Sequence, residues 1–319
     1  MTMTSTFGVR IFTFLVACAL TLAATSWAPL GAQTPRPSKI VIAVQPTSTP
    51  EQLTADAKEL RDYLSKRLNR DVEIVFPMTY AGVVEALRFG HAQAAFMSAW
   101  PAQLAVKYAK ADVALAEVRE VVIGQDKKEE TFYFSYWVVP KDSTVGKLEQ
   151  LRGKRAVFPS PLSTSGFVAP LARLVELGFV PQQPGKEADP KAFFGDVRFV
   201  GGYVQGWEAL KAGQADVAII AGDVSEKLYR EVLAGTKVID QQGPIPSHAV
   251  VFAKDFDPAA KTQLREALLE LGNPEQRMLM RKFISGIFVG FKPTTADQHL
   301  AALDKFLGQT QLAFVERLR

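Results

Sequence analysis

The chain has 319 residues, a formal net charge of +4, a sequence pI near 9.0 and a single cysteine, Cys18. The positive excess is small and no block of Lys or Arg stands out, which argues against a nucleic-acid partner. One cysteine excludes an intrachain disulfide, and the length is sufficient to bury a large core in one or two domains.

The N-terminal segment has the pattern of a secretory signal peptide. Arg10 precedes a long apolar run, and Gly31-Ala32 supplies the small residues of a cleavage site. We therefore expect residues 1–32 to be removed and the protein to be exported. The mature chain then has no cysteine, which excludes a thiolate metal site and a cysteine nucleophile. The alternatives for the same run are a retained membrane span and a lipobox that places a lipid anchor on Cys18.

From residue 39 onward, short strand-like runs alternate with longer helical patterns. In chain order we expect a strand at 40–44, a helix at 51–68, a strand at 72–76, a helix at 80–88 and a strand at 94–97. Strands that alternate with helices form mostly parallel sheets, because parallel strands need a crossover connection that is usually a helix. The first part of the chain is therefore expected to be an α/β unit.

Two strands lead into the second part of the chain, one at 121–123 and an aromatic one at 131–139. The alternation then starts again, with a short helix at 148–151, a strand at 155–158, a helix at 166–177, a strand at 197–200, a helix at 207–213 and a strand at 216–220. A strand at 250–252 is followed by helices at 258–271, 274–283 and 295–307.

Two successive α/β units predict two lobes with a cleft between them. We assign residues 39–134 and 252–319 to the first lobe and residues 138–247 to the second. The crossovers at 135–139 and 247–251 are then the expected hinges. A single doubly wound domain is the alternative organisation.

One tetrapeptide combines hydroxyl side chains with a position typical of anion binding. Ser163-Thr164-Ser165-Gly166 follows the strand at 155–158 and opens the helix at 166–177. Three hydroxyls and unpaired backbone N–H groups at the positive end of a helix dipole can hold an oxyanion, and Gly166 permits a close backbone approach. The alternative is an ordinary helix N-cap, for which Ser and Thr are usual residues.

The motifs, taken in order, resemble the periplasmic phosphate-, phosphite- and phosphonate-binding proteins of ABC transporters. The resemblance runs from about Lys39 to Phe306, and Ser163-Thr164-Ser165-Gly166 matches the family's anion-binding turn letter for letter. Its other landmarks are 80–87, 95–97 with Pro101, 133–135, 138–143, 148–157, Gly213 with Asp216 and Ala218, and 245–247. The resemblance implies a bilobed type II solute-binding fold, with two mostly parallel sheets flanked by helices and joined by a two-stranded hinge.

The resemblance also implies where a small oxyanion would bind. The turn would supply hydroxyl and N–H donors from the second lobe, and domain closure would bring in Tyr80 from the first. The expected ligand-binding set is Ser163, Thr164, Ser165, Gly166, Tyr80, Trp100, Tyr133, Phe134, Tyr203 and His248. Either Tyr133 or Phe134 would line the cleft, and His248, if protonated, would add a charge-assisted bond. For the aromatic residues and His248, the alternative is a structural role in the core.

The sequence departs from the family at positions that bear on the ligand. Tyr203-Val204 stands where the family usually has His followed by an acidic residue, and His248 where an acidic residue is frequent. Since a buried ammonium needs a carboxylate partner, these departures argue against an aminoalkylphosphonate. Trp100 and Phe134 make the expected site smaller and more apolar. We therefore expect a small oxyanion with an apolar edge, such as phosphite or methylphosphonate.

Sequence motifs of catalysis and of metal or cofactor binding are absent. The three histidines, His91, His248 and His299, form no ligand pair, and neither a Gly-x-Ser-x-Gly nor a Gly-x-x-x-x-Gly-Lys-Ser/Thr motif occurs. We therefore predict a protein without enzymatic activity, metal or cofactor. The resemblance implies that it delivers phosphite, phosphate or an alkylphosphonate to an ABC permease. The alternative is a periplasmic sensor that partners a histidine kinase and reports a phosphate-like or metalloid oxyanion.

Overall fold

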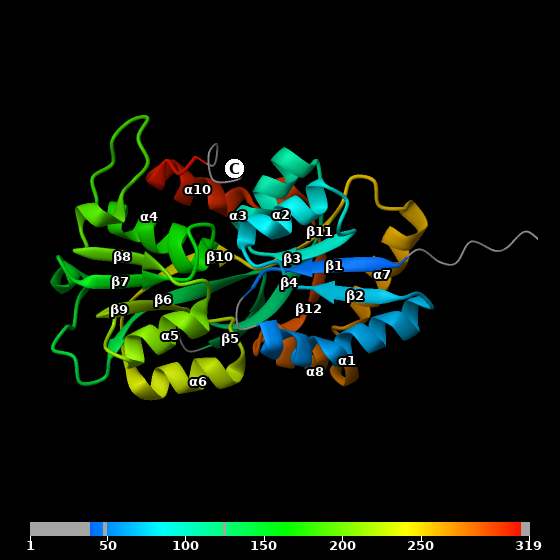
Figure 1. Cartoon of the computed structure of the whole chain (residues 1–319), viewed down its shortest axis with the longest axis horizontal. Coiled ribbons are helices and arrows are strands. Elements are labelled where there is room, and N and C mark those ends of the chain that lie inside the picture. Colours follow the sequence, from blue (N-terminus) through cyan, green and yellow to red (C-terminus); the bar gives the residue numbers. More distant parts are fainter. Residues whose placement is uncertain (1–38, 47–49, 124–125, 314–319) are drawn as a thin grey trace, which may run out of the picture. The chain divides into compact units, whose positions relative to one another are not determined.

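The computed structural model describes residues 39–46, 50–123 and 126–313. The predicted signal peptide and Cys18 lie outside these residues. Pro37–Arg319 forms one compact unit, in which two β-sheets each have helices on both faces (Figure 1). No helix among the described residues is long and apolar enough to cross a membrane.

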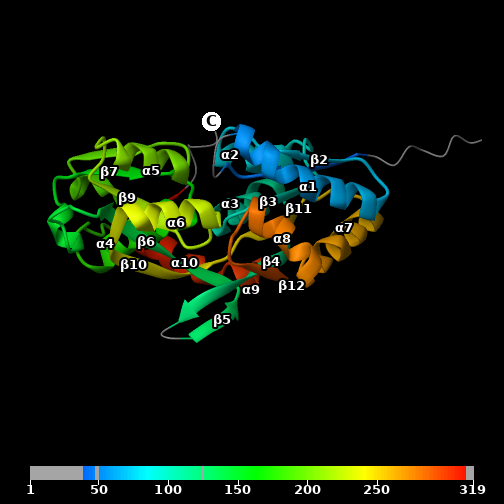
Figure 2. The ribbon, with the colours of Figure 1, turned by 90° about the horizontal axis from the view of Figure 1, so that it is seen from below.

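The first sheet has seven strands in the order β12-β4-β11-β3-β1-β2, with β5 paired to β4. They are β1 (Ile40–Val44), β2 (Val72–Val75), β3 (Ala94–Met97), β4 (Asp112–Ile123), β5 (Asp126–Glu130), β11 (Ala249–Phe252) and β12 (Phe288–Pro293). β1 runs parallel to β2 and β3, whereas the pairs made by β11, β4, β5 and β12 are antiparallel. Figure 2 shows β5 and the end of β4 as a hairpin that extends beyond the rest of this sheet.

Helices cover the first sheet on both faces. They are α1 (Pro50–Leu68), α2 (Tyr80–Arg88), α3 (Ala99–Leu104) with its π-helical continuation η1 (Ala105–Ala109), α7 (Pro258–Glu270), α8 (Pro274–Phe283) and the short α9 (Ala296–His299). The helix α2 begins where it does because Thr79 Oγ1 accepts a hydrogen bond from the Gly82 N–H at 3.0 Å. This cap makes Tyr80 the first helical residue, and its side chain is buried.

The second sheet has five strands in the order β10-β6-β9-β7-β8. They are β6 (Phe132–Pro140), β7 (Arg155–Phe158), β8 (Asp196–Phe199), β9 (Val217–Ala221) and β10 (Thr236–Pro246). Figure 1 shows α4 (Ala169–Glu176) and α10 (Ala301–Thr310) on one face and α5 (Tyr203–Lys211) and α6 (Glu226–Gly235) on the other. The short helical segments are η2 (Leu148–Leu151), η3 (Thr164–Val168) and η4 (Pro190–Ala192).

The two helix-flanked sheets agree with the predicted α/β class, but both sheets are mixed. Only β1, β2 and β3 in the first sheet and β7, β8 and β9 in the second pair in parallel. The sequence analysis also missed α3, α6, β5, β10 and β12, and it found only the end of β4. Glu117 and Arg119 interrupt the apolar pattern of that strand, which explains why its first part was not recognised.

The chain passes between the two sheets at Thr131 and at Ser247, and the Ser247 N–H donates to the Thr131 carbonyl at 2.9 Å. The predicted hinge at 135–139 is misplaced, because β6 pairs within the second sheet from Phe132 onward. The helix α10 packs against α4 of the second sheet, whereas the sequence assignment placed all of 252–319 with the first. The division into two lobes stays a prediction.

An aromatic cluster holds the start of α4 on the second sheet. The Phe158 ring at the end of β7 packs edge to face on Phe167 of η3, at 5.3 Å between ring centroids, and on Trp137 of β6 at 6.0 Å. Aromatic pairs in this geometry are worth about 0.5–1.5 kcal/mol beyond the area they bury. The segment that carries the hydroxyl-rich turn is therefore fixed to the aromatic core of the second sheet.

Candidate functional site

The hydroxyl-rich turn lies at the carboxyl end of β7 and leads through η3 into α4. Ser163 is the N-cap, and its Oγ accepts a hydrogen bond from the Gly166 N–H at 3.0 Å. The side chains of Ser163, Thr164 and Ser165 are buried. A Cβ atom at Gly166 would come within 2.1 Å of Pro159 Cγ, so this close approach requires glycine. The turn is therefore a helix cap, as the alternative reading expected, and also a buried group of hydroxyls.

The Ser165 hydroxyl lies between two buried phenols. Tyr133 Oη donates to Ser165 Oγ at 2.7 Å, and Ser165 Oγ is 2.7 Å from Tyr203 Oη. Because Ser165 accepts the proton of Tyr133, its own proton is available to Tyr203 Oη, and the Tyr203 proton is then available to a further acceptor. Ser163 Oγ is 3.4 Å from Tyr203 Oη, which is long for a hydroxyl pair. This row of hydroxyls ends in an O–H donor beside the turn.

Burial keeps the phenols around the turn protonated. It raises the pKa of Tyr133 and of Tyr203 well above the usual value, and the nearby carboxylate of Asp223 adds to both shifts. Burial likewise raises the pKa of Tyr80, although Ser163 partly offsets this shift. All three phenols are therefore hydrogen-bond donors at neutral pH, and an anion is the group that they would favour.

The turn contacts the first sheet at the start of α3. The backbone N–H of Trp100 donates to Thr164 Oγ1 at 2.9 Å, so Trp100 reaches the turn through its main chain. Two buried hydroxyls of the first sheet, Tyr80 Oη and Ser98 Oγ, make no hydrogen bond of ordinary geometry to the described residues. Buried polar atoms without partners are rare and costly, so these two hydroxyls are donors that a polar group nearby could use.

Side chains alternate between the two faces of β6, so Tyr133 and Phe134 point to opposite sides of the strand. Tyr133 and Ser135 lie on one face of the strand and both bond to Ser165, Ser135 through the Ser165 carbonyl at 2.8 Å. Phe134 lies on the opposite face, where its ring packs edge to face on Phe132 at 6.0 Å. Of the two, Tyr133 is therefore the residue at the turn, and Phe134 is not brought together with its hydroxyls.

His248 lies close to the turn but as a neutral ring. Gln45 Oε1 accepts the Ser98 N–H at 2.8 Å, which directs Gln45 Nε2, a donor, at His248 Nε2 at 3.1 Å. The ring nitrogen must therefore accept. Burial, with a smaller contribution from Arg119, holds the pKa of His248 well below its usual value. The charge-assisted bond expected from a protonated His248 is not supported.

A buried cluster of charges, which the sequence analysis missed, adjoins the turn. Arg119 of β4 donates through Nε and Nη2 to Glu117 Oε2 at 3.0 and 2.6 Å, and its Nη1 is 2.8 Å from Asp223 Oδ2. The guanidinium carbon lies 4.3 Å from the centroid of the Tyr133 ring. Carboxylates do therefore stand beside the site, contrary to the expectation from Tyr203-Val204. Two charged residues with i, i+2 spacing inside an apolar strand were the available sequence signal.

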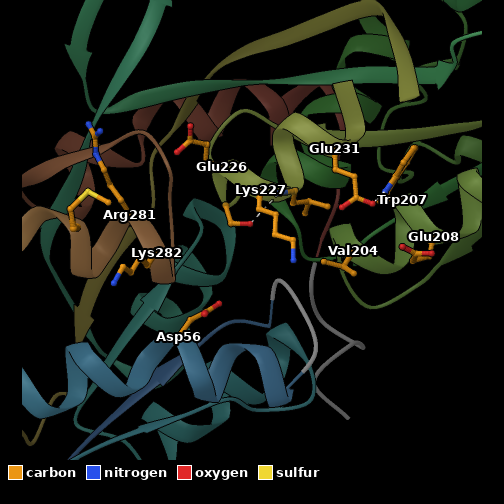
Figure 3. A pocket seen from close by; sticks show the side chains of 12 residues that line it. Asp56, Val204, Trp207, Glu208, Glu226, Lys227, Glu231, Arg281 and Lys282 are labelled. Atoms are coloured by element: carbon orange, nitrogen blue, oxygen red, sulfur yellow. Dashed lines mark hydrogen bonds between the residues drawn. The ribbon is translucent and has the colours of Figure 1, made fainter. Parts of the chain in front are cut away.

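A separate groove lies between α5 and α6 of the second sheet and α1 and α8 of the first (Figure 3). Its volume is about 530 Å³, and none of the predicted site residues lines it. Its polar side chains are partly bonded to each other or to neighbours: Trp207 Nε1 donates to Glu231 at 2.9 Å, and Lys282 pairs with Glu59 at 3.1 Å. Acidic and basic residues are mixed along it, so it lacks the concentration of donors found at the turn.

Comparison with known proteins shows which family the chain resembles over most of its length. Residues 42–300 match the family described as "ABC transporter, phosphonate, periplasmic substrate-binding protein". The phosphate-import protein PhnD of Mycolicibacterium smegmatis is 30% identical over 193 residues, which make up 60% of this chain and 57% of that protein. The match thus spans little more than half the length of that relative.

Two solved structures resemble the fold. A binding-protein component of an ABC phosphonate transporter from Pseudomonas aeruginosa has a TM-score of 0.70 and 21% identity, with 85% of this chain and 86% of that chain covered. PhnD1 from Prochlorococcus marinus in complex with methylphosphonate has a TM-score of 0.69 and 14% identity, with 86% and 98% covered. At these identities the likeness concerns the fold, and it confirms the predicted type II architecture.

Gly166→Ala should lower stability, because the added Cβ would overlap Pro159 and come within 2.7 Å of Ser163 Oγ. Overpacking of this kind costs about 1–3 kcal/mol. Chemical denaturation measures the change in the free energy of unfolding. Gly146→Ala is the matched control, since its nearest neighbour would be 3.9 Å away. An equal effect of the two substitutions would contradict the described packing of the turn.

His248 should make the protein less stable as the pH falls below about 6.5. The pKa of His248 is lowered in the folded chain, so the unfolded chain binds more protons and acidification favours unfolding. His248→Gln should reduce the fall in Tm between about pH 7.5 and pH 5.5 by roughly 2–4 °C. His91→Gln, at an exposed histidine, should not change it. Identical slopes for all three proteins would show that His248 is not held neutral.

Proposed function

Because the chain belongs to the phosphonate family of periplasmic substrate-binding proteins of ABC transporters, we propose that it binds a small phosphorus oxyanion at the Ser163–Gly166 turn. The observation that carries the proposal is the row of buried hydroxyls from Tyr133 through Ser165 to Tyr203, which ends in an O–H donor beside the turn. Tyr80 and Ser98 add two buried hydroxyls from the other sheet. Together these groups supply donors on more than one side of a tetrahedral ion.

The chemistry of the donors favours an anion over a neutral solute. Hydroxyls and N–H groups at the beginning of a helix donate to negatively charged oxygens without a metal or a buried lysine. Each hydrogen bond to a charged group contributes about 1.5–3 kcal/mol, so a few such bonds suffice for a strong complex. Thr164 Oγ1 of the turn and the Trp100 N–H are bonded to each other in this structure. Each could exchange this bond for one to the ligand.

The aromatic surroundings favour phosphite or a short alkylphosphonate. Tyr133 and Tyr203 are buried and bring apolar ring atoms as well as hydroxyls to the turn. Trp100 is also buried and bonds to the turn through its main chain. A ligand with one apolar substituent, either hydrogen or methyl, would place that substituent against the rings and its oxygens on the hydroxyls. The names of the relatives, one a phosphate importer and one solved with methylphosphonate, fit this range of ligands.

Binding at the turn would link the ligand to the relative position of the two sheets. The turn belongs to the second sheet, whereas Tyr80, Ser98 and Trp100 belong to elements of the first. A ligand that accepts hydrogen bonds from both sides favours the conformation in which both sets of donors reach it. An ABC permease would then receive the ligand from this conformation. The alternative role as a sensor has no support from the comparisons, and lipidation of Cys18 stays a prediction.

Ser165→Ala should weaken binding of phosphite, phosphate and methylphosphonate by about 10- to 100-fold, because it removes the hydroxyl that joins Tyr133 to Tyr203. Isothermal titration calorimetry measures the dissociation constants. Ser143→Ala is the control, since the Ser143 hydroxyl accepts the Val145 N–H in a turn that lies outside the site. If Ser165→Ala left the affinity for every one of these ions unchanged, the proposed site would be wrong.

A further inference from the structure

A glycine of the first sheet meets the beginning of α6 without room for a side chain. Gly286 lies in the turn between α8 and β12. A Cβ atom on Gly286 would come within 3.0 Å of both the Cβ and the backbone N of Glu226, and within 3.2 Å of its Cα. Glu226 is the first residue of α6, which covers the second sheet (Figure 1). Elements of the two sheets therefore touch here backbone to backbone.

The close approach, and not the backbone conformation, is what requires glycine at position 286. Gly286 does not have a positive φ, so its φ does not exclude a residue with a side chain. The turn is held on the first sheet, since the Phe288 N–H donates to the Ser285 carbonyl at 3.1 Å and the Glu120 N–H of β4 donates to the Ile287 carbonyl at 2.8 Å. A side chain at position 286 would therefore act mainly on the distance between this turn and α6.

The residues just before α6 make a second contact with the first sheet. Asp223 Oδ2 lies 2.8 Å from Nη1 of Arg119 in β4, and both side chains are buried. The short segment 223–226 therefore contacts the first sheet twice, through an ion pair at one end and through Gly286 at the other. Both contacts join the two sheets, so they favour this relation of the sheets over one in which the sheets have moved apart.

The same relation brings together the two sets of donors proposed for the ligand. Ser165 and Tyr203 belong to elements of the second sheet, whereas Tyr80 and Ser98 belong to the first. The contact at Gly286 is separate from these donors, because the three atoms nearest to a Cβ there all belong to Glu226. Glu226 lines the groove between the sheets, so the contact lies at the edge of that groove (Figure 3).

We propose that Gly286 is a positioning residue for ligand binding. Its missing side chain lets the turn between α8 and β12 reach α6, and this contact stabilises the relation in which donors from both sheets reach the oxyanion. The inference rests on the proposed function and adds a residue that sets the affinity without touching the ligand. Because the apparent affinity scales with the fraction of molecules in the binding-competent conformation, such a residue changes the affinity for every ligand by the same factor.

Gly286→Val should weaken the binding of phosphate, phosphite and methylphosphonate by the same factor, about tenfold, in isothermal titration calorimetry. Gly286→Ala should give a smaller loss, again equal for the three anions, because a Cβ alone requires only a small shift of Glu226. It also serves if Gly286→Val fails to fold, which thermal unfolding without ligand establishes. Gly146→Val is the matched control, since it adds the same side chain at an exposed glycine without a positive φ, where the nearest neighbour of a Cβ is 3.9 Å away.

Distances between two labels measure the relation of the sheets directly. Residues 33–319 contain no cysteine, so Lys66→Cys in α1 and Glu149→Cys in η2 introduce two unique labelling sites, both exposed. At one subsaturating phosphate concentration, single-molecule FRET should find fewer molecules in the liganded relation for Gly286→Val than for Gly146→Val. A variant that is merely less stable would have a lower Tm but the same fraction.

The proposal is overturned if folded Gly286→Val binds all three anions as tightly as the unaltered protein, or if it changes their relative affinities. Equal label distances for Gly286→Val and Gly146→Val at subsaturating phosphate would also overturn it. Failure of the unaltered protein to bind any of the three anions is a different result. It would contradict the proposed function itself, and the role of Gly286 in binding with it.

Discussion

Buried polar groups at the junction of two sheets must bond to each other or to a ligand, and this requirement organises the structure. On the second sheet, the aromatic packing of Phe158 and Phe167 holds the turn in place, and the buried Ser165 hydroxyl bonds to Tyr133 and Tyr203. On the first sheet, the capped start of α2 buries the Tyr80 hydroxyl without a good partner. The Trp100 N–H joins the two sides through Thr164.

The same junction holds two chemically different sets of groups. Hydroxyls and N–H groups around Ser165 are donors that suit negative oxygen, whereas Glu117 and Asp223 repel it unless their charge is neutralised. Arg119 pairs with both carboxylates and offsets part of their charge, and the Tyr133 ring on which it stacks lies between the two sets. The site can therefore be anion-binding although it stands next to two buried carboxyl groups.

The sequence identified the fold and the hydroxyl-rich turn, but it did not reveal the charge cluster beside the turn. The turn was found because Ser163-Thr164-Ser165-Gly166 stands between an apolar strand and a helical pattern, which is a local signal. The choice between Tyr133 and Phe134 needed the register of β6, which the sequence does not contain. Arg119 and Asp223 meet only because β4 and the end of β9 come together from different sheets, and a contact over such a distance in sequence leaves no local pattern. The charged residues of β4 also concealed the strand itself.

The most direct test of the account is a crystal structure of the mature chain grown with inorganic phosphate. The account predicts phosphate oxygens within hydrogen-bonding distance of Ser165 Oγ and Tyr203 Oη, with at least one further bond from Tyr80 or Ser98. A phosphate bound instead in the groove between α1, α6 and α8, with the hydroxyls of the turn still bonded only to one another, would contradict it.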